Sequence, residues 1–227
     1  MIDKVTTLDK AMETLHDGSS IMVGGFGLSG TALMLVREIA NRGYKDLTTI
    51  SEDVSFALGA LVQAPPLIGR KQIKKMVVSF IGSDKKIHEQ INSGGLDIEL
   101  VPQGTLAERI RIGGSGIGGF YTPTGVGTVV EEGKEKKTIN GKDYILELPL
   151  HADVALIKAY KADKMGNLIF KYSARNFNPL MAMAADTVIV EAEEIVEAGE
   201  IAPDQIHLSG VFVDYIVQSE GVKAYAR

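Results

Sequence analysis

Hydrophobic positions in the first half of the chain alternate between two spacings. Short continuous apolar runs are typical of buried strands, and apolar positions three or four residues apart are typical of helices. The runs predict strands over residues 20–26, 47–50, 75–80 and 98–101, and the helical spacing predicts helices over 32–40, 84–91 and 105–110. Strands and helices that alternate in this way favour βαβ units around a largely parallel sheet.

Residues at the element boundaries agree with this pattern. We expect Ser29 or Thr31 to cap the helix over 32–40, and Gly43 follows its basic last turn. The sequence Gln63-Ala64-Pro65-Pro66 predicts a turn between the second and third strands.

The second half of the chain has a different pattern. Strands are predicted over residues 144–148, 154–160 and 168–172, joined by turns, and we expect antiparallel additions to the sheet here. A helix around 181–185 and a strand over 187–191 then restore the α/β alternation. Because no repeat, linker or break in composition divides the sequence, we expect one α/β domain over residues 1–227, with helices flanking a mostly parallel central sheet.

Composition excludes several classes of protein. The 227 residues hold 24 Lys and Arg against 29 Asp and Glu, a net charge of −5, so no basic surface is expected for nucleic acid. The absence of cysteine excludes disulfides, Cys-ligated zinc, iron–sulfur clusters and a thiolate nucleophile, and it fits a reducing cytoplasm. No secretory signal and no apolar run of roughly 18–20 residues is present, so we expect a cytoplasmic protein without a membrane partner.

The most specific local signal is the glycine-rich sequence between the first strand and the first long helix. Glycines at such a junction allow backbone N–H groups to approach an anion or a carbonyl group closely. Gly25, Gly27 and Gly30 also match G-x-G-x-x-G, and Glu52 follows the second strand where a nicotinamide-binding fold places its ribose-binding acid. A dinucleotide site, another ligand loop and a plain tight turn therefore all remain open at this point.

Two further segments carry candidate chemistry. Gln103 lies between a strand end and a helix start, where open α/β sheets bind ligands, so its amide is either an oxyanion donor or a solvent-facing group at the helix entry. Seven of the sixteen residues over 113–128 are glycine, which favours a lid or substrate groove over a plain loop.

Metal and hydrolase chemistry have little support in the sequence. The four histidines are scattered, without a spacing that suggests ligation, and no G-x-S-x-G motif is present. The acidic run over 191–194, with Glu197 and Glu200 beyond it, is interpreted as a solvated face. We therefore expect no metal site.

Several long segments together resemble one family. Residues 17–30, 102–111, 120–125 and the segment from 161–163 to 173–178 are similar, in order, to blocks of the family I coenzyme A transferases. The resemblance is to the A (alpha) subunit of the 3-oxoacid, acetate or butyrate–acetoacetate type.

This resemblance implies an activity and a set of site residues. The family transfers coenzyme A (CoA) between an acyl-CoA and a free carboxylate by a ping-pong route through a glutamyl-CoA thioester. CoA is then a substrate and no separate cofactor is expected. The nucleophilic glutamate of two-subunit members belongs to a partner B subunit, so a hetero-oligomer is implied. Gln103 matches a family glutamine near the oxyanion, and the segment matching the CoA-binding loop is Gly24, Gly25, Phe26, Gly27, Leu28, Ser29 and Gly30.

One segment departs from the family pattern. Ser51-Glu52-Asp53-Val54 stands where A-type halves often show Ser-Asn-Asn, so Glu52 occupies the place that the B half gives to its nucleophile. Glu52 is therefore a second catalytic candidate, either acting in the chemistry or altering the polarity around the substrate carboxylate. Two alternatives to a transferase remain, namely an NAD-dependent oxidoreductase using Gly25, Gly27, Gly30 and Glu52, and a non-catalytic acyl-CoA-binding module.

Overall fold

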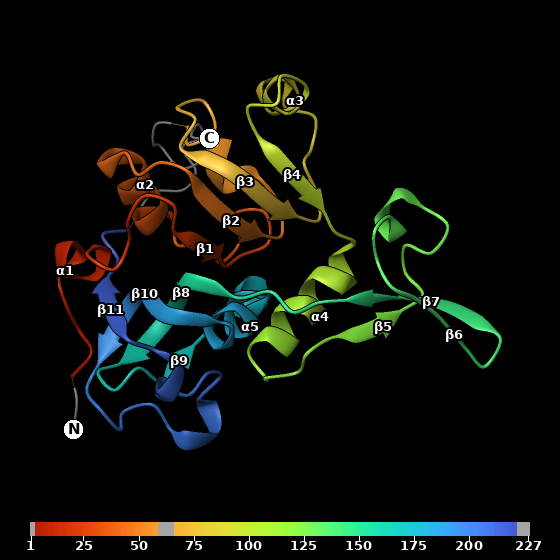
Figure 1. The fold of residues 1–227 in the computed structure, drawn as a ribbon. Helices are drawn as coiled ribbons and strands as arrows, with labels where there is room; N and C mark the ends of the chain where they lie inside the picture. Colours follow the sequence, from red (N-terminus) through yellow and green to blue (C-terminus); the bar gives the residue numbers. More distant parts are fainter. Residues whose placement is uncertain (1–2, 59–65, 222–227) are drawn as a thin grey trace.

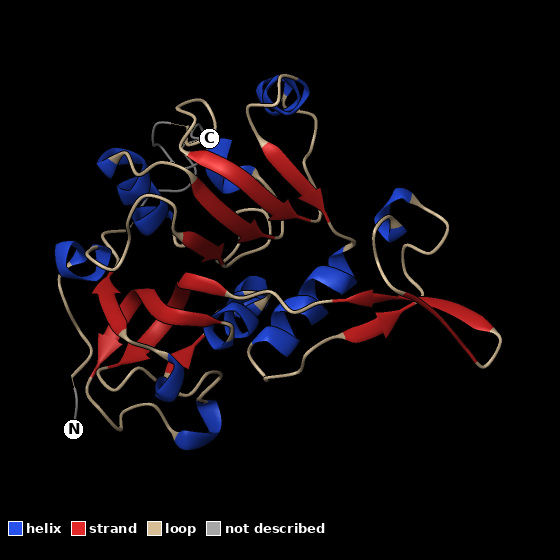
Figure 2. Cartoon of the chain, in the orientation of Figure 1, coloured by secondary structure: helices blue, strands red, loops and turns tan. Residues whose placement is uncertain are grey.

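A mostly parallel sheet forms the centre of the computed structural model, which describes residues 3–58 and 66–221 (Figures 1 and 2). Its strands, in spatial order, are β11 (Tyr215–Gln218), β10 (Ala185–Val196), β8 (Ala152–Asp163), β1 (Ser20–Val23), β2 (Leu47–Ser51), β3 (Ile73–Val78) and β4 (Asp97–Leu100), with β9 (Leu168–Ile169) beside β8. All of these neighbours pair in parallel except β9, which is antiparallel to β8. The predicted α/β class is confirmed. Most of the turn predicted at 63–66 lies outside the described residues.

A second, smaller sheet projects from the main body at the right of Figure 1. Its antiparallel strands, in spatial order, are β5 (Phe120–Thr122), β7 (Lys142–Glu147) and β6 (Lys136–Ile139). The antiparallel additions expected in the second half are found here and at β9.

The strand predicted over 154–160 is not one of these additions. It is part of β8, which pairs in parallel with β1 on one side and with β10 on the other. The chain between β4 and β8 runs through a helix and the whole small sheet, and a connection of that length allows a strand to return in the parallel direction.

Helices cover both faces of the central sheet. They are α1 (Leu8–Met12), α2 (Leu33–Arg42), α3 (Lys85–Asn92), α4 (Gln103–Gly113) and α5 (Asn178–Met183), with 3₁₀ turns at Ser55–Leu58, Val129–Glu131, Tyr172–Arg175, Pro203–Gln205 and Gly210–Phe212. Asp84 caps α3 by accepting from the N–H groups of Lys86 and Ile87, and Gly43 ends α2 with a φ of 74°. Neither Ser29 nor Thr31 caps α2, whose N-cap is Ala32 without a side-chain hydrogen bond.

Side chains of the inner strands of the central sheet are divided between two hydrophobic cores. In β1, Ile21 and Val23 join the core beneath α1, α2 and α3, whereas Met22 joins the core beneath α4 and α5. Because both faces of these strands are buried, their sequences are continuous apolar runs and do not alternate between apolar and polar residues.

The strand order reverses direction at the pair β8 and β1. From β1 the chain proceeds to β2, β3 and β4 on one side, and β8, β10 and β11 lie on the other. Open α/β sheets bind ligands outside the carboxyl ends of the strands at such a switch point. The sequence that leaves β1 there is the glycine-rich loop over 24–30.

Candidate active site

The glycine-rich loop makes a tight turn between β1 and α2. Phe26 and Ser29 exchange backbone hydrogen bonds of 3.0 and 3.1 Å, and Gly25, Gly27 and Gly30 have φ angles of 125°, 60° and 76°. Such positive φ values are costly for residues with a Cβ atom. The turn therefore needs glycine at these three positions.

Close packing also requires glycine at three positions of the loop. A Cβ on Gly24 would lie 2.1 Å from Oδ1 of Asn178, one on Gly25 would lie 2.2 Å from Oγ1 of Thr31, and one on Gly30 would lie 2.6 Å from the carbonyl oxygen of Ala174. A Cβ on Gly27 would meet only Asp53 Oδ2, at 3.9 Å. Gly27 is thus the loop glycine at which an added Cβ would meet the least crowding.

Two asparagines hold the loop from the other side. The side chain of Asn176 donates to the carbonyl oxygen of Ser29 at 2.8 Å, and that of Asn178 donates to the carbonyl oxygen of Gly30 at 2.9 Å. Asn178 is fully buried and also accepts from the N–H of Lys158 in β8. Both asparagines lie in one of the segments that resemble the family, and no role for either was predicted from the sequence.

Gln103 lies at the first position of α4, directly after β4 and beside the glycine loop. It lines an open cavity of about 310 Å³ together with Phe26, Gly104, Ala107, Asn176, Phe177 and Leu180. Its side-chain amide also donates to Oε1 of Glu52 at 3.2 Å. The structure therefore brings together both predicted catalytic residues and the loop, although they lie far apart in the sequence.

Glu52 follows β2 and is only 5% exposed. Its Oε1 accepts from Ser79 Oγ at 3.1 Å as well as from Gln103, and its Oε2 lies 3.5 Å from the N–H of Gly27. The space beside it is about 10 Å³. That space holds a water molecule at most, so an acyl or CoA adduct on Glu52 has no room in this arrangement.

Helix α4 is anchored to the rest of the molecule through Arg109. This side chain donates to the carbonyl oxygen of Leu148 at 2.8 Å and to Glu99 Oε1 in β4 at 2.6 Å, and it lies 3.7 Å from the buried Glu147. Burial raises the pKa of the Glu99 carboxyl, but Arg109 and Lys75 outweigh it and hold that pKa below its ordinary value. These contacts fix the helix that carries Gln103.

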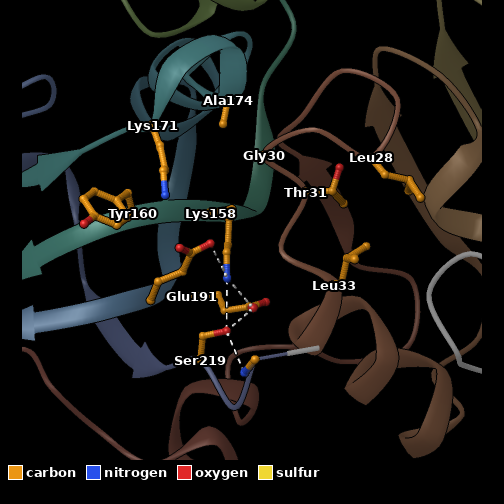
Figure 3. A pocket seen from close by; sticks show the side chains of 12 residues that line it. Leu28, Gly30, Thr31, Leu33, Lys158, Tyr160, Lys171, Ala174, Glu191 and Ser219 are labelled. Carbon is orange, nitrogen blue, oxygen red and sulfur yellow. Dashed lines mark hydrogen bonds and ion pairs between the residues drawn. The ribbon is translucent and has the colours of Figure 1, made fainter. Parts of the chain in front are cut away.

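A second cavity, about 370 Å³, has Gly30 in its wall (Figure 3). Its wall includes Leu28 of the loop, Thr31 just after the loop, and Leu33 of α2. The other lining side chains used below are Lys158, Tyr160, Lys171, Glu191 and Ser219. The Lys171 ammonium lies 4.8 Å from the centre of the Tyr160 ring. This cavity was not predicted from the sequence, because its walls come from five separate segments of the chain.

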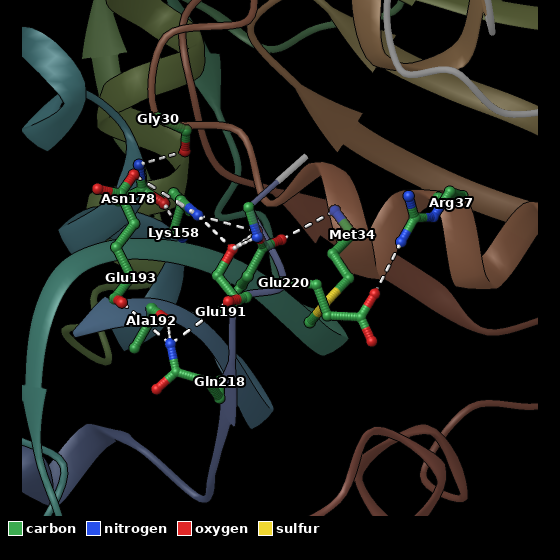
Figure 4. Close-up of polar contacts among 12 residues, drawn as sticks. Gly30, Met34, Arg37, Lys158, Asn178, Glu191, Ala192, Glu193, Gln218 and Glu220 are labelled. Carbon is green, nitrogen blue, oxygen red and sulfur yellow. Dashed lines mark hydrogen bonds and ion pairs between the residues drawn. The ribbon is translucent and has the colours of Figure 1, made fainter. Parts of the chain in front are cut away.

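Glu191 is the centre of a polar network beside this cavity (Figure 4). It accepts from Lys158 Nζ at 2.8 Å, from Ser219 Oγ at 2.7 Å and from the N–H of Met34 at 2.9 Å. Its exposed fraction is 1%, so the interpretation of residues 191–194 as a solvated face is wrong at Glu191. The residue lies within β10, where all residues from Val188 to Ala192 are buried because both faces of the strand are covered.

Other candidates from the sequence lie apart from this site. Gly113 and Gly114 end α4, where a Cβ would lie 2.0 Å from the carbonyl oxygen of Leu150 and 2.6 Å from that of Met183, respectively. Packing therefore accounts for glycine at these two positions of the second cluster. Within the described ranges, no three His, Asp or Glu side chains are grouped so that they could hold a metal ion. No helix in the same ranges is long and apolar enough to span a membrane.

Comparisons with known proteins identify the family. The coenzyme A transferase family model matches residues 5–219. The A-type chain of a probable succinyl-CoA:3-ketoacid coenzyme A transferase of Bacillus subtilis is 53% identical, over 92% of this chain and 86% of the relative. The alpha chain of the acetate CoA-transferase of Escherichia coli K12 is 48% identical, over 98% and 100% of the two chains.

The fold agrees with solved structures. An acyl-CoA transferase of Escherichia coli O157:H7, solved as a thioester complex with CoA, superposes with a TM-score of 0.86 at 18% identity, covering 100% of this chain and 49% of that one. The chain therefore belongs to the coenzyme A transferase family. Within that family it is an A-type (alpha) subunit, one component of a multi-subunit transferase. Neither the oxidoreductase nor the non-catalytic alternative has support from these comparisons.

Proposed function

We propose that this subunit works with a B subunit to move CoA between a short-chain acyl-CoA and a free carboxylate of the acetate, butyrate or 3-oxoacid class. The names of the relatives support this range of substrates. The cavity beside Gln103 supports it too, since Phe26, Phe177 and Leu180 give it apolar walls while the Gln103 amide supplies a polar group.

The chemistry assigns separate roles to the two subunits. The thioester carbonyl is attacked by a glutamate of the B subunit, and CoA leaves as a thiolate to give an acyl-glutamyl anhydride. The thiolate then attacks the glutamyl carbonyl, which releases the acyl group as a carboxylate and leaves a glutamyl-CoA thioester. An incoming carboxylate runs the same two steps in reverse and departs as the new acyl-CoA.

Each of these attacks passes through an oxyanion, and we assign its stabilisation to Gln103. A side-chain amide carries two N–H groups, and the one that bonds Glu52 leaves the other for the cavity. A donor held in place before the reaction lowers the barrier because no reorganisation is needed. We assign CoA contacts to the loop over 24–30, at Gly27 above all.

The single observation that carries the proposal is the position of the Gln103 amide at the open cavity beside the glycine loop. The crowding of Glu52 supports a nucleophile outside this chain. Large apolar side chains at the same edge of the sheet are exposed, with Phe26 at 51%, Phe80 at 62% and Leu100 at 53%. Exposed apolar groups of this kind support a partner subunit that covers the site. One domain over 1–227 and a cytoplasmic location remain predictions from the sequence.

The test is to find which of the two chains becomes modified. This chain is coexpressed with a B subunit, incubated with acetoacetyl-CoA and treated with borohydride, which reduces a glutamyl thioester to the alcohol. Intact mass should show modification of only the B subunit, and this chain, when isolated, should remain unmodified. Modification of this chain at Glu52 would overturn the proposed division of roles.

A further inference from the structure

Glu52 is a buried carboxylate that follows β2, and its contacts come from residues after three other strands. They are Gly27 after β1, Ser79 after β3 and Gln103 after β4. Ser79 Oγ lies 2.9 Å from the backbone carbonyl oxygen of Glu52 and 3.1 Å from its Oε1, so its single O–H is shared between these two acceptors. The N–H of Ser79 donates to the same backbone oxygen at 2.9 Å. Both carboxylate oxygens therefore have contacts within the chain, Oε1 with Ser79 and Gln103 and Oε2 with the N–H of Gly27.

This carboxylate determines how the Gln103 amide is oriented. Gln103 is itself exposed and lies at the first position of a helix, where its side chain has many rotamers in solvent. A carboxylate accepts hydrogen bonds, so the amide must turn its NH₂ end, and not its carbonyl oxygen, towards Glu52. The reverse orientation would place two acceptor oxygens against each other.

The orientation has a consequence for catalysis. With one N–H on Glu52, the second N–H of the same nitrogen is held about 120° away by the planar geometry of the amide. If the amide were free to rotate, its carbonyl oxygen would face a developing oxyanion for part of the time and would repel it. Fixing the donor in advance is the condition under which such a group contributes most to rate.

We propose that Glu52 is a positioning residue that selects the orientation and rotamer of the Gln103 amide, and that it neither attacks the substrate nor touches it. This inference rests on the proposed function, which assigns the oxyanion to Gln103. From the sequence, Glu52 was expected either to act in the chemistry or to alter the polarity around the substrate carboxylate. The proposed role differs from both, because Glu52 acts on the reaction only through the side chain of Gln103.

The test is a double-mutant cycle in the complex with a B subunit, using Glu52→Ala, Gln103→Ala and the double variant. Gln103→Ala should lower kcat by roughly 10²–10³. Glu52→Ala should lower kcat about tenfold with little change in KM for the acyl-CoA, as expected for loss of one orienting hydrogen bond. In the Gln103→Ala background, Glu52→Ala should cost less than about twofold. Equal losses in the two backgrounds would overturn the proposal.

Conservative and control variants separate positioning from a structural or chemical role. Glu52→Gln keeps a carbonyl oxygen for the Gln103 amide and should restore most of kcat, whereas a nucleophile would lose activity with this change. Ser79→Ala removes a donor from the same carboxylate oxygen without touching Gln103, and it should change kcat much less than Glu52→Ala. Thermal unfolding of each variant reports any loss of fold.

A failure of the proposed function gives a different pattern. An inactive wild-type complex, or full activity in Gln103→Ala, contradicts the oxyanion role itself. The orientation is then measured in the isolated chain from the side-chain amide resonances of Gln103, assigned with Gln103→Ala. These resonances should move towards free-glutamine values in Glu52→Ala and move much less in Ser79→Ala, which keeps the carboxylate and its contacts with Gln103 and Gly27. Resonances that do not move in Glu52→Ala would overturn the positioning role independently of activity.

Discussion

The carboxylate of Glu191 in β10 accepts a hydrogen bond from the backbone N–H of Met34 at the start of α2, 2.9 Å away. The helix that leaves the glycine loop is thus capped by a residue 157 positions away rather than by its own N-cap side chain. A carboxylate at a helix N-terminus satisfies a free donor and interacts favourably with the helix dipole. This hydrogen bond therefore links β10 to the start of α2, just after the glycine-rich loop.

Removing this carboxylate should destabilise the fold strongly. In Glu191→Ala, Lys158 loses its buried partner, and α2 loses its cap. Loss of one member of a buried pair costs about 3–5 kcal/mol, which urea unfolding measures. Glu193→Ala is the matched control, since Glu193 is 50% exposed and 3.7 Å from the same lysine, and it should cost less than about 0.5 kcal/mol. Equal costs for the two variants would contradict the capping role.

Two loop glycines should respond differently to substitution. Gly24→Ala places a Cβ against the buried Asn178 and should destabilise the chain by about 1–3 kcal/mol. In Gly27→Val the new Cβ meets only Asp53 Oδ2, at 3.9 Å, so the free energy of unfolding should fall by only about 1–2 kcal/mol, because of the positive φ. CoA binding should weaken, because the side chain stands where we expect the ligand to approach. Calorimetry on the folded variant measures the CoA affinity, and an unchanged value would remove Gly27 from the CoA site.

Asn176 should affect CoA binding through the loop. Asn176→Ala removes the hydrogen bonds to the carbonyl oxygens of Ser29 and Ser173, and loss of one or two such bonds should weaken CoA affinity up to about tenfold. The change should appear in KM for acyl-CoA more than in kcat, because the loop positions the ligand and not the oxyanion. A fall in kcat at constant KM would contradict this assignment.

Glu99 provides a test that depends on pH. Because Arg109 and Lys75 hold its folded-state pKa below the ordinary value of 4.5, the carboxylate stabilises the fold above that pH, and the contribution is lost as pH falls through the folded-state pKa. Glu99→Gln should therefore cost about 1 kcal/mol at pH 7, allowing for partial exposure, and progressively less in acid. Unfolding at several pH values checks this, and a cost independent of pH would show that charge is not the cause.

The chain's own residues determined the elements and some of their ends. Apolar runs located β1 to β4, helical spacing located α2 and α3, and Asp84 and Gly43 stand at helix ends as local capping chemistry requires. Gln103 was predicted at a strand end because that position depends only on neighbouring residues. These features need no distant contact, so the sequence was sufficient for them.

The tertiary structure decided what depends on contacts between distant residues. The parallel pairing of β8 with β1, the burial of Glu191 and the hold of Asn176 and Asn178 on the loop each join segments more than 100 residues apart. The hydrogen bond from the Gln103 amide to Glu52 spans 51 positions. Local periodicity carries no information on which strands become neighbours, and a charged residue is expected to be exposed until a partner for it is known. Gln103 and Glu52 could each be predicted as candidates from the sequence, but their contact depends on the order of the strands, so only the tertiary structure showed it.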